Sequence, residues 1–424
     1  MRTERLTESA EGYLALTESQ AMALARLGRN LASRKAWWGE KPEDVDAHKE
    51  RTVIRCTPER PGLWRVRVAD AVGVIAVDGL QIVVGAKIPA GHLLYLMEKS
   101  GRLPRLAAEG ANVAVDKTMW ELVAEWYTAS LEGVLRRDLI KDYRAVTDEL
   151  QLARGHVDLY RTARAYYDGR LVIACEFDEF DADTPLNRVL RAAAAGVAGS
   201  PLLRPELRRR ARRLLARMDH VGEMRLGDRS VSVDRRTAHY RDAVSLAIHI
   251  IDGQGRGLEH GGAASWAFLI RTPEMIEEGL RRVLVESLAG RWRVRKRRVP
   301  VKGTGLTLNP DLVFNETMAA GDIKYKLASD WVRADLYQVV TFAEGVRARF
   351  GCVVNFQKGT VKSLPPLLIG EISVSHFSWN ADPDVAPEDA GREVAGAVVT
   401  WLEGISRPPV VSEKRGGEAA EINP

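Results

Sequence analysis

Two aspartates and a lysine stand close together in a strand-like part of the sequence. The segment "LNPDLVFNETMAAGDIKYK" (308–326) contains Asp311, Asp322 and Lys324. Alternate residues of a strand share a face, so Asp322 and Lys324 point one way while Ile323 points the other. If the two strands of this segment pair as a hairpin, both aspartates and the lysine converge on one small site.

This combination of side chains predicts metal-assisted hydrolysis of a phosphodiester. Neighbouring carboxylates repel each other, and a bound divalent cation relieves the repulsion. Oxygen ligands with room for water favour Mg²⁺ or Mn²⁺. A lysine beside the metal can orient a water molecule or stabilise negative charge at phosphorus. We therefore predict Asp311 and Asp322 as catalytic metal ligands and Lys324 as the catalytic lysine.

Two flanking segments with helical patterns offer companions for these residues. Glu277 borders the apolar face of the segment 271–290, which makes it the candidate third acid and third metal ligand. Gln338 lies in "DLYQVVTF" (335–342), where it could contact a metal-bound water or the phosphate backbone.

Asp311, Asp322 and Lys324 can also be interpreted as residues with a purely structural role. Asp311 could cap a turn after Asn309 and Pro310, and Asp322 with Lys324 could be a charge pair on an edge strand. The order of helix with Glu, strand with Asp, strand with Asp-x-Lys and helix with Gln favours the nuclease interpretation over these alternatives.

The elements that must position the site belong to a chain of several domains. At 424 residues the chain is too long for one ordinary core. Short alternating runs predict strands between residues 51 and 104, and three- and four-residue spacing predicts a helix from 116 to 154. A hairpin with an Asp168-Gly169 turn and further helices are expected next. The predicted divisions are a helical extension (1–48), a β-rich module (49–115), a mainly helical middle domain (116–255), a nuclease domain (256–410) and a disordered tail (411–424).

Composition narrows the class of protein. The sequence is 46% hydrophobic and 28% charged and has no run of eighteen uncharged apolar residues, so we expect a cytoplasmic protein without a membrane segment. The three cysteines form no CxxC pair, which argues against a structural zinc site. The net charge of +5 is concentrated in two basic runs, 204–218 and 291–302. Either run could contact nucleic acid, and the second is favoured because it adjoins the acids.

The motifs together resemble the PD-(D/E)xK nuclease superfamily and, more narrowly, the McrC family, the nuclease subunits of McrBC-type (type IV) modification-dependent restriction systems. The resemblance spans roughly residues 51–400 and includes "VGVIAVDGLQIVVGAKI", "LARGHVDL" with Gly155, "TPLNRVLRAA" with Asn187 and Arg188, "NPDLVF", "GDIKYK" and "DLYQVVTF". The sequence departs from the family pattern at Ala86, Ile323 and Phe342.

The resemblance implies a mixed α/β (α+β) multidomain fold with a C-terminal restriction-endonuclease-like domain. It also implies an Mg²⁺-dependent DNA endonuclease that cuts double-stranded DNA carrying modified cytosine, with Asp311, Asp322 and Lys324 at the family's catalytic positions. The implied partner is an McrB-like AAA+ GTPase motor, which would bind the GTP, dock on the β-rich module and middle domain, and be stimulated by this chain. Consistently, the sequence contains no GxxxxGK[ST] loop.

Two alternatives remain open at this point. The nuclease could serve a defence system that recognises unmodified phage DNA, or the chain could be a non-catalytic assembly subunit that activates the motor. Solvent-facing basic residues of the middle region, such as Arg188, could contact the motor, although helix packing or a surface ion pair would explain them equally well.

Overall fold

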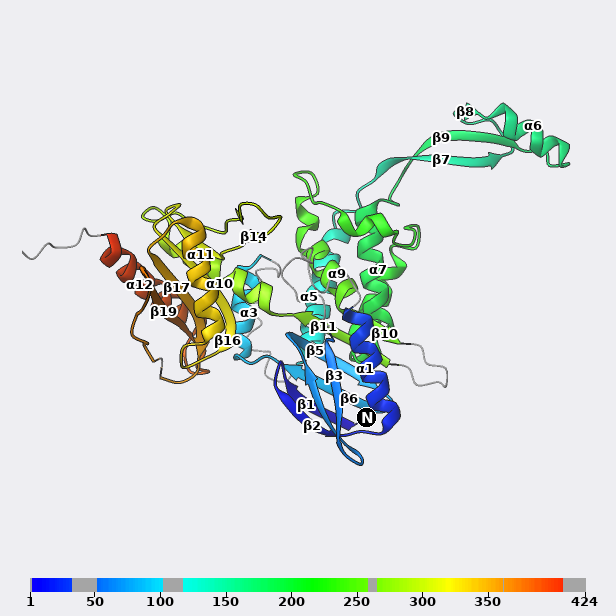
Figure 1. Ribbon diagram of the computed structural model, residues 1–424. Helices are drawn as coiled ribbons and strands as arrows, with labels where there is room; N and C mark the ends of the chain where they lie inside the picture. Colours follow the sequence, from blue (N-terminus) through cyan, green and yellow to red (C-terminus); the bar gives the residue numbers. More distant parts are fainter. Residues whose placement is uncertain (1, 33–51, 102–116, 258–264, 361, 407–424) are drawn as a thin grey trace, which may run out of the picture. The chain divides into compact units, whose positions relative to one another are not determined.

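The computed structural model describes residues 2–32, 52–101, 117–257, 265–360 and 362–406 (Figure 1). The chain forms two compact units, Met1–Gly279 and Leu280–Pro424, and helix α10 (Pro273–Leu288) runs across the boundary. The mixture of helices and sheets confirms the predicted fold class. No helix in the described ranges is long and apolar enough to cross a bilayer. The predicted tail lies outside the described residues.

The first unit begins with a β-rich module. A five-stranded sheet has the order β1-β6-β5-β11-β10, and a three-stranded sheet has the order β2-β4-β3. Helix α1 contributes Leu24, Leu27 and Leu31 to a core shared with both sheets. The elements are β1 (Arg2–Thr7), β2 (Glu11–Ala15), α1 (Glu18–Ala32), β3 (Ile54–Arg60), β4 (Leu63–Val68), β5 (Ala71–Val77), β6 (Leu80–Gly85), α3 (Ala90–Lys99), β10 (Gln254–Gly257) and β11 (Ser265–Arg271).

The predicted helical extension at the N-terminus is wrong for Arg2–Thr7 and Glu11–Ala15, which are strands. Strand β1 pairs in parallel with β6, and β2 pairs antiparallel with β4, so this segment completes the two sheets. Among the described residues of this segment, α1 agrees with the helical prediction, and the rest of the predicted extension (33–48) lies outside the described residues. At the other end of the first unit, β11 pairs with β5, although its residues were assigned to the nuclease domain.

Four helices form the body of the middle region, as the periodicity predicts. Thr118 begins the first of them with a capping box, in which its side chain and that of Glu121 satisfy each other's backbone N–H groups. Trp120 on the same helix packs against Trp266 and Phe268 of β11, which ties the helices to the five-stranded sheet. The helices are α5 (Met119–Leu135), α7 (Pro185–Gly199), α8 (Pro205–Ala216) and α9 (Arg241–Gly253).

A two-stranded arm extends from these helices (Figure 1). Strands β7 (Asp142–Leu150) and β9 (Ile173–Asp181) pair antiparallel along their whole length, and β8 (His156–Val157) joins β9 near the far end. Helix α6 (Leu159–Tyr167) follows β8. The sequence predicted β7 as helix and α6 as strand, and both assignments are wrong. Gly155 has φ of 67°, and a Cβ there would meet the Glu176 carbonyl oxygen, which explains the glycine.

The base of the arm is fixed by the Asn187-Arg188 pair of α7. Asn187 Nδ2 donates to the carbonyl oxygens of Ile140 (2.9 Å) and Ala182 (2.8 Å), which flank the two arm strands. The Arg188 guanidinium makes two hydrogen bonds to the Asp228 carboxylate, at 2.7 and 2.9 Å. Arg188 is only 4% exposed, so the prediction that it faces solvent is wrong. Arg188 also forms an ion pair with Asp183 (3.2 Å), just beyond the end of β9, which links the base of the arm to the helices.

The second unit is built on a six-stranded sheet of order β12-β15-β16-β17-β19-β18. Strands β16, β17 and β19 are parallel to one another. Helix α11 packs on the face that bears Val353 and Val374, and α12 packs on the opposite face, where Trp401 contacts Phe377. The elements are β12 (Val294–Arg295), β13 (Val299–Pro300), β14 (Thr307–Leu308), β15 (Leu312–Phe314), β16 (Ala319–Leu327), α11 (Arg333–Val346), β17 (Phe350–Gln357), β18 (Leu367–Ile369), β19 (Ile372–Asn380) and α12 (Pro387–Ser406).

Candidate functional site

The predicted hairpin of the acid and lysine cluster is present in the second unit. Strand β15 pairs antiparallel with β16, with Leu312 opposite Gly321. One step further along this register, Asp311 stands opposite Asp322. Residues 315–318 make the connecting turn, in which Asn315 has φ of 41° and Glu316 has φ of 68°. The register of this turn therefore brings the two acids together.

The strand alternation distributes the side chains as predicted. Ala320 packs in the core beneath α11 and has the same parity as Asp322 and Lys324. Ile323 and Tyr325 are buried, and Tyr325 contacts Phe356 on the other face. The charged residues thus lie on the α11 face of the sheet, and the core packing on the opposite face is left intact.

Asp322 is the most perturbed group of the site. It is 2% exposed, and this burial raises the pKa of its carboxyl to about 7 against the opposing effect of Lys324. Nζ of Lys324 lies 2.7 Å from Oδ2 of Asp322. The neighbouring carboxyl of Asp311 raises the pKa of Asp322 further, because two negative charges would otherwise lie side by side.

Asp311 has a lysine of its own that the sequence reasoning missed. Nζ of Lys296 donates to Oδ1 of Asp311 at 2.8 Å, and the backbone N–H of Ile323 donates weakly to Oδ2 at 3.4 Å. The site is therefore a row of alternating charges, Lys296, Asp311, Asp322 and Lys324. Lys296 directly follows β12, which pairs with β15, and the sequence carried no signal for that pairing.

Helix α11 brings Gln338 to the same face of the sheet. Lys326, two residues after Lys324, forms an ion pair with the buried Asp335 in the first turn of this helix. Gln338 follows Asp335 by one helical turn and is half-buried. The structure thus places Gln338 on the helix that covers the site, and its role stays a prediction.

Glu277 lies on the part of α10 that belongs to the first unit. There it is close enough to Lys87 to influence that lysine: burial lowers the pKa of Lys87, and Glu8, Asp70 and Glu277 counteract the effect. The role of Glu277 as a metal ligand stays a prediction.

The donor set can be compared with the needs of a divalent cation. In the described ranges, no group of three His, Cys, Asp or Glu side chains lies close enough to hold a metal ion. Asp311 and Asp322 nevertheless present carboxylate oxygens together, and the buried Oδ2 of Asp322 has no partner at hydrogen-bonding geometry. Two carboxylates with water or phosphate oxygens suit Mg²⁺, which keeps several waters and needs few protein ligands.

The two basic runs differ in how far their charge is neutralised. On α8, Arg204 pairs with Glu125 and Arg210 pairs with Glu132, both on α5. This pairing favours a structural role for the first run. In the second run, Arg293, Arg295 and Arg297 all lie near one carboxylate, that of Glu316, which leaves an excess of positive charge beside the site.

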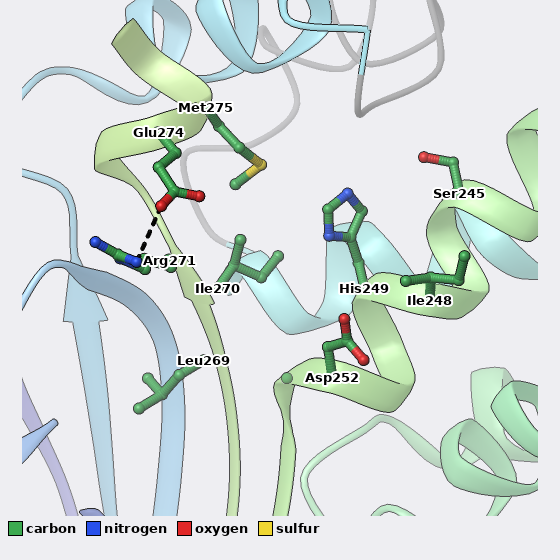
Figure 2. Close-up of a pocket in the computed structure, with 10 residues that line it drawn as sticks. Ser245, Ile248, His249, Asp252, Leu269, Ile270, Arg271, Glu274 and Met275 are labelled. Atoms are coloured by element: carbon green, nitrogen blue, oxygen red, sulfur yellow. Dashed lines mark hydrogen bonds and ion pairs between the residues drawn. The ribbon is translucent and has the colours of Figure 1, made fainter. Parts of the chain in front are cut away.

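A cavity of about 280 Å³ lies elsewhere, between α9, β11 and the start of α10 in the first unit (Figure 2). None of the predicted site residues lines it. Its charged side chains are already paired, because Arg271 binds Glu274 at 3.1 Å and Asp252 forms an ion pair with Arg229 outside the cavity. This arrangement suggests no reaction chemistry.

Comparisons with known proteins agree with these observations. A family model described as "McrBC 5-methylcytosine restriction system component" matches residues 66–354. No curated protein matches the chain. The fold is similar to a chain in the refined half-complex from the tetradecameric assembly of Thermococcus gammatolerans McrB AAA+ hexamers with bound McrC, with a TM-score of 0.61, 16% identity, and coverage of 93% of this chain and 100% of that chain. A chain of the Thermococcus gammatolerans McrBC complex gives a TM-score of 0.45, 18% identity, and coverage of 68% and 88%. Because the family model spans more than half of its length, the chain belongs to the family of McrBC restriction system components.

Proposed function

We propose that this chain is the Mg²⁺-dependent DNA endonuclease subunit of a modification-dependent restriction system. The observation that carries the proposal is the convergence of Asp311, Asp322 and Lys324 on one face of the second unit's sheet. Membership in the family supports the restriction role. The substrate is double-stranded DNA that carries modified cytosine, and the reaction is hydrolysis of a phosphodiester bond.

Each side chain of the site has a role in this reaction. Asp311 and Asp322 would hold the Mg²⁺ or Mn²⁺ ion, with Glu277 as the proposed third ligand. When bound, the ion supplies a Lewis acid for the phosphate and a more acidic water. Lys324, held beside Asp322, orients the attacking water and balances the negative charge that develops at phosphorus. Gln338 contacts the water or the phosphate backbone.

The second basic run provides the DNA-contacting surface in this proposal. Arg293, Arg295 and Arg297 project from and beyond β12 around Glu316, close in sequence to Lys296 and the acids. Guanidinium groups match the geometry of phosphate oxygens. These contacts position the backbone and carry no sequence information, so recognition of the modified base falls to the partner.

The partner in this proposal is an McrB-like AAA+ motor, which binds and hydrolyses GTP. The similar solved chain comes from an assembly of McrB AAA+ hexamers with bound McrC. In this chain the far end of the arm suits docking, because large apolar and aromatic side chains are exposed there without a covering element. We define the arm tip by these residues: Leu152, Leu159, Tyr160, Tyr166, Tyr167 and Leu171.

The proposal is tested by separating cutting from motor stimulation. The Asp322→Ala and Lys324→Ala variants should lose cleavage of methylated DNA in the presence of the motor and GTP, while GTPase stimulation is retained. Lys358→Ala, which removes an exposed lysine of the same unit, is the matched control and should cut normally. Unimpaired cutting by the first two variants would refute the site, and would favour a non-catalytic activating subunit. Equal cutting of unmethylated DNA would point instead to unmodified phage DNA as the target.

A further inference from the structure

The basic side chains of β12 and of the residues beside it form two groups. Arg295 pairs with Val313 across the β12–β15 ladder, and its side chain reaches Glu316. Lys296, the first residue after β12, instead donates to Asp311. Lys296 therefore does not belong to the arginine cluster around Glu316, and its ammonium group stands where a cation bound by Asp311 would stand.

We infer that Lys296 is a resident counter-cation of Asp311, which competes with the divalent metal ion and sets the metal concentration that the site requires. This inference rests on the proposed function. It goes beyond it, because it assigns a positioning role to a residue outside the predicted catalytic set. The role needs no direct contact between Lys296 and the reacting atoms.

The two lysines of the site differ in how easily they can leave their acids. The Lys324 side chain is 24% exposed and pairs with an aspartate that is almost fully buried. The Lys296 side chain is 52% exposed, and Asp311 beneath it is 15% exposed. Lys296 can therefore move its ammonium group into water, where it is well solvated, when a metal ion takes its place beside the largely buried Asp311. Lys296 is the lysine that a metal ion at Asp311 displaces.

Displacement has a measurable cost. A half-exposed lysine–carboxylate pair contributes only modestly, and double-mutant cycles on such pairs correspond to roughly two- to fivefold in an equilibrium constant. The metal ion must overcome this attraction, and it must also approach an ammonium group of like charge. Removing Lys296 should therefore make metal binding tighter, which is the opposite of what loss of a ligand or of local structure would cause.

The test is calorimetric titration of the full-length chain with Mn²⁺ in the absence of DNA. Lys296→Gln should bind Mn²⁺ roughly two- to fivefold more tightly than the wild type. Lys296→Arg keeps the positive charge and should bind as the wild type does. Lys302→Gln removes an exposed lysine from the same basic run and controls for the general loss of positive charge.

The same titration of an Asp311→Asn variant distinguishes a failure of this inference from a failure of the proposed metal site. Asp311→Asn alone should weaken Mn²⁺ binding, and adding Lys296→Gln to it should give no further gain, because the two residues then no longer interact. If Asp311→Asn binds Mn²⁺ as the wild type does, the proposed metal site is wrong. If Asp311→Asn weakens Mn²⁺ binding, the metal site stands. In that case the role of Lys296 is refuted when the Mn²⁺ affinity of Lys296→Gln equals that of Lys302→Gln or that of Lys296→Arg.

Discussion

Replacing Asp322 by Asn should stabilise the metal-free protein while it removes the activity. Asp322 is buried beside a second carboxyl, that of Asp311. Asn has nearly the same shape, carries no charge and places an amide oxygen near Lys324. The substitution therefore removes the cost of burying a carboxylate and leaves the packing of the sheet in place.

The magnitude follows from the pKa of the carboxyl. A rise from 3.8 to about 7 means that the folded state binds this proton more tightly than the unfolded state. The contribution of Asp322 to stability is therefore fully present below pH 3.8 and is lost as the pH rises towards 7, because the folded state must then hold a buried charge. The full shift corresponds to about 4 kcal/mol. Because Lys324 loses its charged partner in the variant, we expect a net gain of about 1–3 kcal/mol at pH 8.

The assay is urea unfolding in EDTA at several pH values. The advantage of Asp322→Asn over the wild type should grow between pH 5 and 7 and stay constant above pH 7. Asp384→Asn, at an exposed site of the same unit, should change stability by less than about 0.5 kcal/mol at every pH. A variant that is no more stable than the wild type at pH 8, or a gain independent of pH, would refute the reasoning about Asp322.

Two further predictions concern the arm. Arg188→Met should cost about 3–5 kcal/mol in urea unfolding, because it leaves the buried Asp228 carboxylate without its cation, whereas Arg209→Met on the exposed face of α8 should cost less than about 1 kcal/mol. Equal costs would show that the buried pair of Arg188 and Asp228 contributes no more than an exposed pair does. The second prediction concerns Tyr167, which is 88% exposed at the arm tip. The substitution Tyr167→Ser should weaken motor binding roughly 10- to 100-fold and should not lower the folding stability. Tyr337→Ser, on α11, is the control, and equal motor binding by the two variants would exclude the arm tip as the docking surface.

The local part of the site could be predicted from the sequence, and its non-local part could not. Asp311, Asp322 and Lys324 lie within one hairpin, so the two-residue period of a strand was enough to place them on a common face. Lys296 reaches Asp311 only because β12 pairs with β15, and no pattern in either strand specifies that register. For the same reason the sequence could not show that α11 presents Asp335 to Lys326.

The fold shows the same division. Strands β5 and β6 are joined by a tight turn, and their alternating residues allowed both strands to be predicted from the sequence. Strand β1 is a polar edge strand that pairs with β6, more than seventy residues away, so neither its composition nor its neighbours suggested a strand. In α6 the large side chains that imitate a strand pattern are exposed at the arm tip. Because these side chains are exposed, the apolar pattern of α6 does not mark a buried face, and the helix could not be told from a strand.

The turn at residues 315–318 links the length of the chain to the chemistry of the site. The two acids lie on either side of this turn, and they face each other only when the four connecting residues are present in full. Inserting or deleting one residue there would slip β15 by one position and turn Asp311 towards the opposite face of the sheet. Most surface loops tolerate changes of length, but this one should not, although none of its residues is proposed to take part in the reaction. A deep scan of single-residue insertions and deletions should therefore identify this turn as sharply as a scan of substitutions identifies the acids.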